Sequence, residues 1–485
     1  MMKVFLPTLL LTAIYCLLPM MCYAADGATV YVAGDGTGDY NCDGTDDQVE
    51  INAALDKAAA DPQITTVYLK GPFKYRINNT VKISSDTVLT GDSTAVLKLA
   101  DRVSWTSEQA MISNKGYTSF GDKNIEIYGF ELDGNREGNT QMTSGKGYHQ
   151  LFYFKYANNV SIHDMYLHNN HGDGLKFNTG DNVKFYNNTI DRLGHDGLYA
   201  LKSTNVEAYN NRITCRTNSA LRVYNSNHVS FHDNVIDSHN EGGSGIEIQK
   251  ESSGYVMDDI EIFNNAIYNT AYAGIWVFGS GSYDKAQTIN LHIHHNKIYN
   301  TGLNGSGSWV GGIVLNGFHN ALVENNVFDG VYGSAISIRT VYSYPALGTG
   351  YVLYARNNII VNTRPHAAGG RGVAFYNSHP SDYTIVTDNN LLFSNPGGNY
   401  YNTSSTNDIV ADPLFVDAAN RDYHLKSLGG RWTGQDWVVD AVHSPGIDAG
   451  YMESPFDLEP APNGGRVNIG LYGNTPYAAK SAPAQ

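Results

Sequence analysis

The sequence predicts an all-β fold, a parallel β-helix of stacked coils with a capping helix at its N-terminal end. Asn-Val or His-Val pairs recur at steps of 23 residues between residues 159 and 229, and a fixed step of this size is typical of a stacked repeat. Short runs of alternating apolar and polar residues follow one another with no crossover helix, which favours a β-helix over a barrel or a βαβ fold. The step is also too short for a β-propeller, whose blades carry about 40–45 residues.

The composition agrees with this fold and restricts the partners. Charged residues make up only 16% of the 485 residues, whereas Gly (50) and Tyr (34) are abundant, as in a chain rich in strands and turns. The net charge of −15 argues against nucleic acid as a partner. An anionic ligand would need a local basic patch.

Residues 1–24 are typical of a secretory signal peptide, because Lys3 precedes a long apolar run that ends in small residues at Ala24. An uncleaved anchor helix is the alternative, and the small-residue end disfavours it. No other stretch is long and apolar enough to cross a bilayer. We therefore expect a secreted or cell-surface protein without membrane contact after cleavage. The mature chain would keep Cys42 and Cys215, which permit one disulfide without indicating it.

Residues 25–120 are expected to form an N-terminal capping module and the first coils. Within them, residues 49–60 place apolar side chains on one helical face directly after Asp46 and Asp47, which are typical helix-capping residues. A helix before a stack of strands is the expected cover for the open apolar end of that stack.

Residues 121–407 are expected to form the parallel β-helix itself. Each unit has a first strand, a tight polar turn, a second apolar pair and a third strand. The turn carries a column of asparagines: Asn188, Asn211, Asn234, Asn265, Asn296, Asn326, Asn358 and Asn390. Stacked amides can hydrogen-bond along the stack. We interpret this column as structural, because a catalytic role would not need eight copies.

After Asn234 the repeat step rises to 30–32 residues. The extra residues lie in four loops, at 251–258, 279–288, 301–311 and 340–350. Insertions in a repeat usually gather on one face and often shape the binding site. Residues 408–485 do not continue the repeat. We expect a C-terminal closing segment there, since the last unit of a stack must cover the open end of the sheets.

Strand alternation identifies the side chains that face outward from the third strand of each unit. With the leucines and isoleucines inside, the outward column is Tyr153, Lys176, Tyr199, Arg222, Glu247 and Trp276. Just before these strands lie two acids and two histidines: Asp173, Asp196, His171 and His195. Lys202 and Lys250 add basic groups at the strand ends. Because neighbouring coils are about 4.8 Å apart, these residues share one small patch of wall.

This patch has the groups that glycoside chemistry needs, and Asp173, Asp196, Glu247 and His195 are the predicted catalytic residues. Asp173 and Asp196 occupy equivalent positions one coil apart, a backbone spacing of about 5 Å that falls in the range of retaining glycosidases. Asp196 and Glu247 are two coils apart, near ~10 Å, at or beyond the upper limit for inverting enzymes. His195 would adjust the pKa of Asp196 or serve as a base itself.

The remaining residues of the patch are predicted to bind substrate: Tyr153, His171, Lys176, Tyr199, Lys202, Arg222, Lys250 and Trp276. A basic set in a protein of net charge −15 would attract an anionic sugar such as a uronate. The same wall also allows β-elimination, in which Arg222 or Lys176 neutralises a uronate carboxylate, His195 or Lys176 takes the C5 proton and Tyr199 protonates the leaving oxygen. Uronate epimerisation and a non-catalytic glycan-binding role are further alternatives. Hydrolysis requires no cofactor.

A separate motif fits the spacing of a calcium loop. Its predicted ligands are Asp39, Asn41 and Asp43, with Gly44 at the turn and Glu50 at the twelfth position. No helix precedes the motif, and acids that cap the following helix are the alternative explanation. The motif makes a structural Ca²⁺ an expectation to test.

Two sets of motifs resemble known families. Residues 44–48 before the capping helix, residues 130–135 (Phe-Glu-Leu-Asp-Gly-Asn) and the Asn-Asn turns resemble the pectate-lyase-like superfamily of right-handed, single-stranded parallel β-helices. Residues 411–415 (Ala-Asp-Pro-Leu-Phe) and 444–450 (Ser-Pro-Gly-Ile-Asp-Ala-Gly) are similar to the disaggregatase and disaggregatase-related secreted proteins of methanogenic archaea.

These resemblances imply a secreted enzyme that degrades an acidic matrix polysaccharide. For the second family that glycan is methanochondroitin, which contains glucuronic acid and N-acetylgalactosamine. The resemblance also makes a homotrimer an expectation, since side-by-side trimers recur among β-helix glycan enzymes. It identifies no catalytic positions, so the predicted site depends on the repeat register. We expect an endo-acting glycoside hydrolase, with a polysaccharide lyase on the same wall as the alternative.

Overall fold

The computed structural model describes residues 27–118, 121–142, 149–215, 217–239, 242–250, 255, 257–279, 288–304, 309–315, 320–339, 351–367 and 370–483. The predicted signal peptide lies outside these residues, and so do all or parts of the four predicted insertion loops. None of the helices in the described ranges has the length and apolar character needed to cross a membrane.

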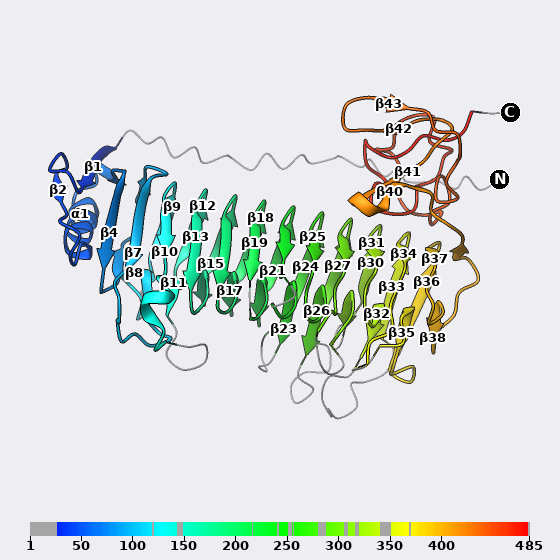
Figure 1. Ribbon diagram of the computed structural model, residues 1–485, viewed down its shortest axis with the longest axis horizontal. Helices are drawn as coiled ribbons and strands as arrows, with labels where there is room; N and C mark the ends of the chain where they lie inside the picture. Colours follow the sequence, from blue (N-terminus) through cyan, green and yellow to red (C-terminus); the bar gives the residue numbers. More distant parts are fainter. Residues whose placement is uncertain are drawn as a thin grey trace, which may run out of the picture.

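Three long parallel sheets run side by side along the molecule and form a β-helix, as predicted (Figure 1). In each coil the chain passes through sheet C, then sheet A, then sheet B. Sheet C has 12 strands. They are β5 (Val81–Ile83), β8 (Ala110–Asn114), β11 (Gln150–Lys155), β14 (Leu175–Asn178), β17 (Leu198–Leu201), β20 (Leu221–Tyr224), β23 (Ile246–Lys250), β26 (Ile275–Gly279), β29 (Ile313–Leu315), β32 (Ser334–Ile338), β35 (Val373–Asn377) and β38 (Tyr400–Tyr401).

Sheet A has 14 strands. They are β1 (Ala28–Ala33), β2 (Tyr40–Asn41), β3 (Ile64–Leu69), β6 (Thr87–Gly91), β9 (Lys123–Tyr128), β12 (Asn158–His163), β15 (Asp181–Tyr186), β18 (Thr204–Tyr209), β21 (Asn227–His232), β24 (Met257–Phe263), β27 (Thr288–His294), β30 (Ala321–Glu324), β33 (Tyr351–Arg356) and β36 (Tyr383–Asp388).

Sheet B has 13 strands. They are β4 (Phe73–Ile77), β7 (Ala95–Leu99), β10 (Glu131–Asp133), β13 (Tyr166–Asn170), β16 (Thr189–Leu193), β19 (Arg212–Cys215), β22 (Val235–Asp237), β25 (Ala266–Tyr268), β28 (Lys297–Tyr299), β31 (Val327–Asp329), β34 (Ile359–Val361), β37 (Leu391–Phe393) and β39 (Ile409–Val410). One 3₁₀ turn, η1 (Glu137–Asn139), follows β10.

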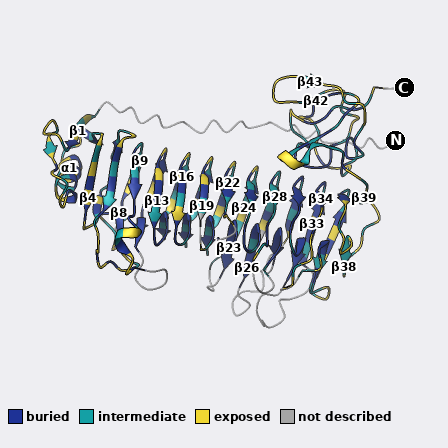
Figure 2. Ribbon diagram, viewed as in Figure 1, coloured by how far each residue is buried: buried dark blue, intermediate teal, exposed yellow. Residues whose placement is uncertain are grey.

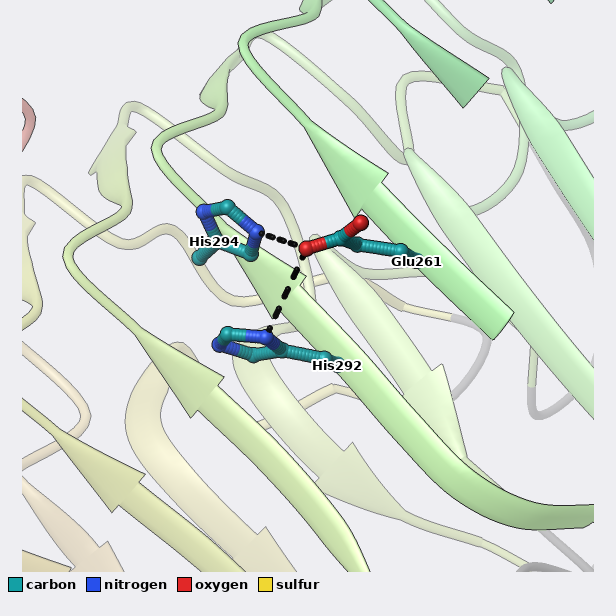
Figure 3. Close-up of side chains that lie close together, drawn as sticks. All are labelled: Glu261, His292 and His294. Atoms are coloured by element: carbon teal, nitrogen blue, oxygen red, sulfur yellow. Dashed lines mark hydrogen bonds and ion pairs between the residues drawn. The ribbon is translucent and has the colours of Figure 1, made fainter. Parts of the chain in front are cut away.

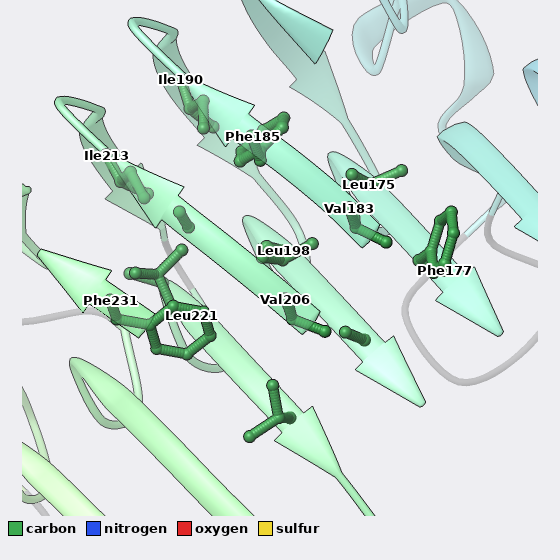
Figure 4. Packing of buried hydrophobic residues seen from close by; sticks show 14 of the residues in the cluster. Leu175, Phe177, Val183, Phe185, Ile190, Leu198, Val206, Ile213, Leu221 and Phe231 are labelled. Atoms are coloured by element: carbon green, nitrogen blue, oxygen red, sulfur yellow. The ribbon is translucent and has the colours of Figure 1, made fainter. Parts of the chain in front are cut away.

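The interior of the stack is filled by columns of identical or similar apolar residues. Leu175, Leu198 and Leu221 pair in register on adjacent strands of sheet C, and all three are fully buried (Figure 4). Buried residues recur along the strands of the whole stack, and exposed residues are frequent in the C-terminal segment (Figure 2). Burying each such side chain contributes about 1.5–3 kcal/mol of transfer free energy.

The capping helix α1 (Gln48–Ala60) lies at the N-terminal end of the stack. It buries Ile51, Ala54, Leu55 and Ala58, which is the face that the sequence predicts. Asp47 is fully buried, and its carboxylate accepts hydrogen bonds from the backbone N–H groups of Asp43, Gly44 and Arg76 instead of capping the helix. Cys42 beside it is a free, buried thiol.

The asparagine column forms one continuous ladder of hydrogen bonds, as predicted. From Asn188 to Asn358, the side-chain oxygen of each next asparagine accepts from both the backbone N–H and the side-chain amide of the one before it. Asn390 makes the same two bonds to the carboxylate of Asp408, which ends the ladder.

The C-terminal segment does more than close the end of the stack. After β39 it forms the hairpin β40 (Phe415–Asp417) and β41 (Asp422–Leu425) around the 3₁₀ turn η2 (Ala418–Asn420), and the pair β42 (Arg431–Trp432) and β43 (Trp437–Val438). Its apolar residues pack on the outer face of the last strands of sheet B, in a second core cluster that includes Val327, Ile359, Leu391, Tyr423 and Ile469. Figure 1 shows it folded back beside the last coils.

Candidate active site

The outward column predicted on sheet C exists in the structure. The strand register pairs Tyr153 with Lys176, Lys176 with Tyr199, Tyr199 with Arg222, Arg222 with Glu247, and Glu247 with Trp276. Each side chain therefore lies one coil from the next, on the face opposite the buried leucines.

Asp173 and Asp196 belong to a second ladder, in the turns that lead into sheet C. The Asp173 carboxylate accepts from the backbone N–H of Asp196 at 3.0 Å, and the Asp196 carboxylate accepts from the backbone N–H of Ser219 at 3.0 Å. Gln150 begins the ladder by accepting from the N–H of Asp173 at 2.6 Å. Part of the role of both acids is therefore structural, and both side chains are buried, with 1% and 0% exposed.

His195 lies between the two carboxylates. Its Nδ1 is 2.6 Å from Asp173 Oδ1 and 3.2 Å from Asp196 Oδ2, while 21% of its side chain is exposed. Burial opposes the imidazolium charge, but the two acids outweigh burial and raise the pKa of His195 to about 9. The ring is therefore a cation at neutral pH, and Nδ1 donates to a carboxylate.

Arg222 joins Asp196 to Glu247. Its Nη1 is 3.4 Å from Asp196 Oδ2, and its Nε is 3.6 Å from Glu247 Oε2. Gln249 completes the bridge, because its side-chain oxygen accepts from Nη2 of Arg222 at 2.7 Å and its amide donates to Glu247 at 3.0 Å. Burial raises the pKa of Glu247 and of Asp196, and the Arg222 charge only partly offsets it.

Tyr199 and Lys176 lie beside these groups on sheet C. The guanidinium of Arg222 lies over the Tyr199 ring at 4.6 Å, and burial raises the pKa of Tyr199 well above its ordinary value. Lys176 lies over the Tyr153 ring at 4.5 Å and 3.9 Å from Glu108. Tyr153 itself is only 2% exposed.

Four further residues are predicted to bind substrate. His171 is buried and bonds through Nε2 to the Arg136 carbonyl at 3.1 Å. Lys202 lies in the turn after β17 and extends over Tyr255 at 5.4 Å, and Lys250 is buried at the end of β23. Trp276 packs against Phe278 and Trp309, with ring centroids 5.1 and 5.7 Å away.

The sequence interpretation missed Asn218 and Glu108. The Asn218 amide donates to Asp196 Oδ1 at 2.7 Å and lies 3.5 Å from Nε2 of His195. Glu108 binds Lys155 at 2.8 Å. Asn218 adjoins Ser219, which continues the 23-residue step from Asp196, so the step itself was the available signal. Glu108 precedes the regular repeat, and no periodicity identifies it.

Two clusters near the predicted sites have the side chains of a metal site. The ligand atoms of Asp173, His195 and Asp196 lie within 4.8 Å of one another, a closeness that the His195 hydrogen bonds already explain. At the predicted calcium loop, Glu50 lies with Cys42 and Asp47. Asp39, Asn41 and Asp43 instead accept local backbone hydrogen bonds from Tyr31, Gly38 and Thr45. Calcium binding by these four residues stays a prediction.

Family models match most of the β-helix and part of the C-terminal segment. Residues 123–257 match the model described as right handed beta helix region, and residues 257–450 match the model described as Disaggregatase related. Residues 257–450 are thus similar to disaggregatase-related proteins, and the residues before them to right-handed β-helices. No curated protein sequence matches it significantly.

Solved structures agree with these matches at the level of the fold. The chain is similar to the A-module of Azotobacter vinelandii mannuronan C-5 epimerase AlgE6, with TM-score 0.56, 17% identity, and coverage of 76% of this chain and 96% of that one. The AlgE4 A-module from the same organism gives TM-score 0.56, 18% identity, and coverage of 79% and 100%. These likenesses support the right-handed β-helix that the sequence resemblance implied.

Proposed function

We propose that this chain is a secreted enzyme that hydrolyses glycosidic bonds in an anionic, uronate-containing polysaccharide, with His195 as the proton-transfer group. The observation that carries the proposal is the position of His195, a partly exposed imidazolium whose Nδ1 is held by two buried carboxylates. A surface that served only as a rigid spacer would have no need for buried acids, because burying a charge is costly.

In this proposal the predicted acids Asp173 and Asp196 have a supporting role. Asp173 and Asp196 are too buried to touch a sugar, so they act as positioning residues that hold the ring and stabilise its charge. In the proposed reaction, Nε2 of His195 gives its proton to the glycosidic oxygen as the bond to the anomeric carbon breaks. Water then adds to that carbon, and the neutral imidazole takes the proton that the water loses.

Basic groups on the wall of sheet C support an anionic substrate. Lys176 lies on the wall one coil from Tyr199 and two coils from Arg222. Arg222 is engaged by Asp196, Glu247 and Gln249, whereas Lys176 is 3.9 Å from Glu108, so Lys176 is the less tightly engaged cation and the better one to meet a uronate carboxylate. Together with the disaggregatase-related match of residues 257–450, this supports a methanochondroitin-type glycan as substrate. The homotrimer that the resemblance implies remains part of the proposal.

Elimination, or C5 epimerisation, is the second candidate. Tyr199 supports it, because a phenol with a raised pKa keeps its proton and can deliver it to a leaving oxygen. His195 opposes it, since a ring that is cationic at neutral pH cannot take the C5 proton of a uronate. The base would then have to be Lys176.

The test is incubation of the purified chain with glucuronate-containing polysaccharides, including methanochondroitin. Hydrolysis gives new reducing ends without the ultraviolet absorbance of an unsaturated uronate, whereas elimination gives both. If neither product forms, and Asp173→Asn, Asp196→Asn and Glu247→Gln leave glycan binding unchanged, the proposal of bond cleavage fails, and a uronate epimerase, which forms neither product, or a binding protein remains.

A further inference from the structure

A cluster of two imidazoles and a carboxylate lies on the outer face of sheet A. His292 and His294 are alternate residues of β27, so they project from the same face, and Glu261 on β24 pairs in register with His292. The ligand atoms of the three side chains lie within 4.8 Å of one another. Figure 3 shows both rings directed at the Glu261 carboxylate, with Oε1 3.0 Å from His294 Nε2 and 3.9 Å from His292 Nδ1.

The hydrogen bonds behind His294 determine which of its nitrogens carries hydrogen. Nε2 of His295 is 2.9 Å from the Gly473 carbonyl, which only accepts, so this nitrogen carries the hydrogen of a neutral His295. Nδ1 of His295 then accepts from Nδ1 of His294 at 2.7 Å. In a neutral His294 the lone pair is therefore on Nε2, which faces the Glu261 oxygen.

His292 is held in the same way. Its Nε2 donates to Glu324 at 3.0 Å, and Glu324 is fixed by Nε of Arg356 at 2.8 Å. The Nδ1 lone pair of a neutral His292 is thereby directed toward Glu261. Two nitrogen lone pairs and a carboxylate oxygen converge, and each ring is anchored through its other nitrogen. Metal-binding histidines are characteristically oriented by such outer partners.

The same sheet contains two internal comparisons. His163 and His232 belong to the same stacked ring column as His294 and bind Glu126 and Glu207, the residues equivalent to Glu261. At those coils, however, Ser161 and Ser230 replace His292. Aspartates, Asp164 and Asp233, replace His295 and bind Nδ1. Only the coil of β27, among these three, brings a second imidazole to the carboxylate.

We propose that Glu261, His292 and His294 bind a divalent transition-metal ion, with Zn²⁺ as the expected ion. Two imidazole nitrogens and one carboxylate oxygen suit Zn²⁺, whereas calcium and magnesium prefer oxygen ligands alone. Tetrahedral zinc takes ligands at about 2.0–2.2 Å, which small side-chain adjustments reach from the observed separations. The side chains of Glu261 and His292 are 46% and 35% exposed, so a fourth position is open to water.

The position of the site indicates what the ion does. His295, which orients His294, bonds to Gly473 of the C-terminal segment, and the neighbouring Asn325 donates to the Gly470 carbonyl at 3.0 Å. Arg356, which fixes Glu324, lies over the Tyr451 ring at 4.8 Å. An ion that fixes His292 and His294 therefore also favours docking of the C-terminal segment against the turns that follow β27 and β30. This site is independent of the chemistry proposed on sheet C.

The test is calorimetric titration of the metal-free full-length chain with ZnCl₂, together with thermal unfolding with and without the ion. We expect one ion per chain and a higher Tm with zinc. His292→Ala should abolish binding, and Glu324→Gln, which loosens an outer partner, should weaken it about 10–100-fold. Glu207→Gln, at the equivalent position beside His232, is the matched control and should change nothing. Co²⁺ bound at the site should give the visible absorption of a tetrahedral nitrogen–oxygen complex.

Three outcomes would overturn the proposal. The first is that the chain binds no zinc. The second is that Glu207→Gln weakens binding as much as Glu261→Gln, which would mean general surface adsorption. The third is that Asp173→Asn abolishes binding while His292→Ala leaves it intact, which would place the ion on sheet C.

Discussion

Two ladders of side-chain oxygens run through this molecule, and they differ in charge. The ladder from Asn188 to Asn390 is built of amides and ends on Asp408, whereas the ladder from Gln150 to Ser219 contains Asp173 and Asp196. Each asparagine oxygen accepts the backbone N–H of the preceding coil, whereas each aspartate accepts that of the next coil, both at about the same distance. An asparagine also donates, so the amide ladder satisfies itself. An aspartate only accepts, so its charge needs a cation.

The difference separates a stabilising role from a chemical one. Where the fold needs only an acceptor in a buried turn, an amide is sufficient and carries no desolvation cost for a charge. The carboxylates of the second ladder occur only where His195 and Arg222 lie against them. We therefore expect mutations in the amide ladder to change stability and mutations around the charged ladder to change activity.

The largest expected effect is on catalysis by His195. His195→Gln removes the proton-transfer group and should lower the rate of reducing-end release by about 10²–10⁴-fold, while circular dichroism shows an unchanged fold. His228→Gln, an exposed histidine on sheet A, is the control and should be fully active. Retention of most of the activity by His195→Gln would remove the functional distinction between the ladders.

A mutation in the amide ladder should lower stability and leave activity unchanged. Asn265 is fully buried, and its side-chain amide donates to the Phe231 and Phe263 carbonyls and to Asn296. Asn265→Ala leaves several buried groups unsatisfied and should lower the free energy of unfolding by about 3–5 kcal/mol. Urea unfolding measures this loss, with exposed Asn407→Ala as the control. The activity of the molecules that remain folded should not change.

Asp196→Asn makes the charged ladder locally neutral. The new side chain still offers an oxygen to the Ser219 N–H, so the coil should persist, but Arg222 and His195 lose an anion. We expect activity to fall about 10–100-fold, which is less than for His195→Gln and more than for Asn265→Ala, because the acid acts through His195. The pKa of His195, followed by NMR titration, should fall toward its ordinary value. Asp181→Asn at the exposed start of β15 should alter neither quantity.

The smallest expected effect is that of pH. The folded-state pKa of His195 is raised from 6.5 to about 9, so the folded chain binds this proton more tightly than the unfolded chain. Its stabilising contribution is complete below about pH 6.5 and is lost as the pH rises through about 9. Activity that needs the imidazolium should halve near pH 9 and fall about tenfold one unit above it. A rate that rises through this range would instead favour elimination.

The repeat architecture could be predicted because it depends on patterns between residues that are close together in the sequence. Strand alternation and the 23-residue step give the outward column and the asparagine ladder without any tertiary information. The same arithmetic also separates the two histidines, since His171 and His195 are 24 residues apart and so occupy different turn positions. His171 accordingly bonds to the Arg136 carbonyl, away from the acids.

The remaining features depend on contacts that the repeat does not encode. The ladder that contains Asp173 and Asp196 runs through four equivalent positions, which are occupied by three residue types because Gln150 and Ser219 belong to it as well. Since the residue type is not repeated from coil to coil, the sequence does not indicate that the two acids accept backbone hydrogen bonds. The burial of these acids follows from packing by neighbouring turns. The C-terminal segment returns to the outer face of sheet B through apolar contacts between residues far apart in sequence, such as Val327 and Ile469.

The amide ladder also has a direction. Each asparagine oxygen accepts from the N-terminal side, and the amide donates to the next residue of the ladder as well as to a carbonyl of the preceding coil, so the side-chain carbonyl dipoles from Asn188 to Asn390 share one direction. Such a row has a partial positive end, as an α-helix has at its N-terminus. That end meets the carboxylate of Asp408, which accepts from both the backbone and the side chain of Asn390. The stack is thus an electrically polarised rod with an anion at its positive pole, and a coil inserted anywhere along it would preserve that polarity.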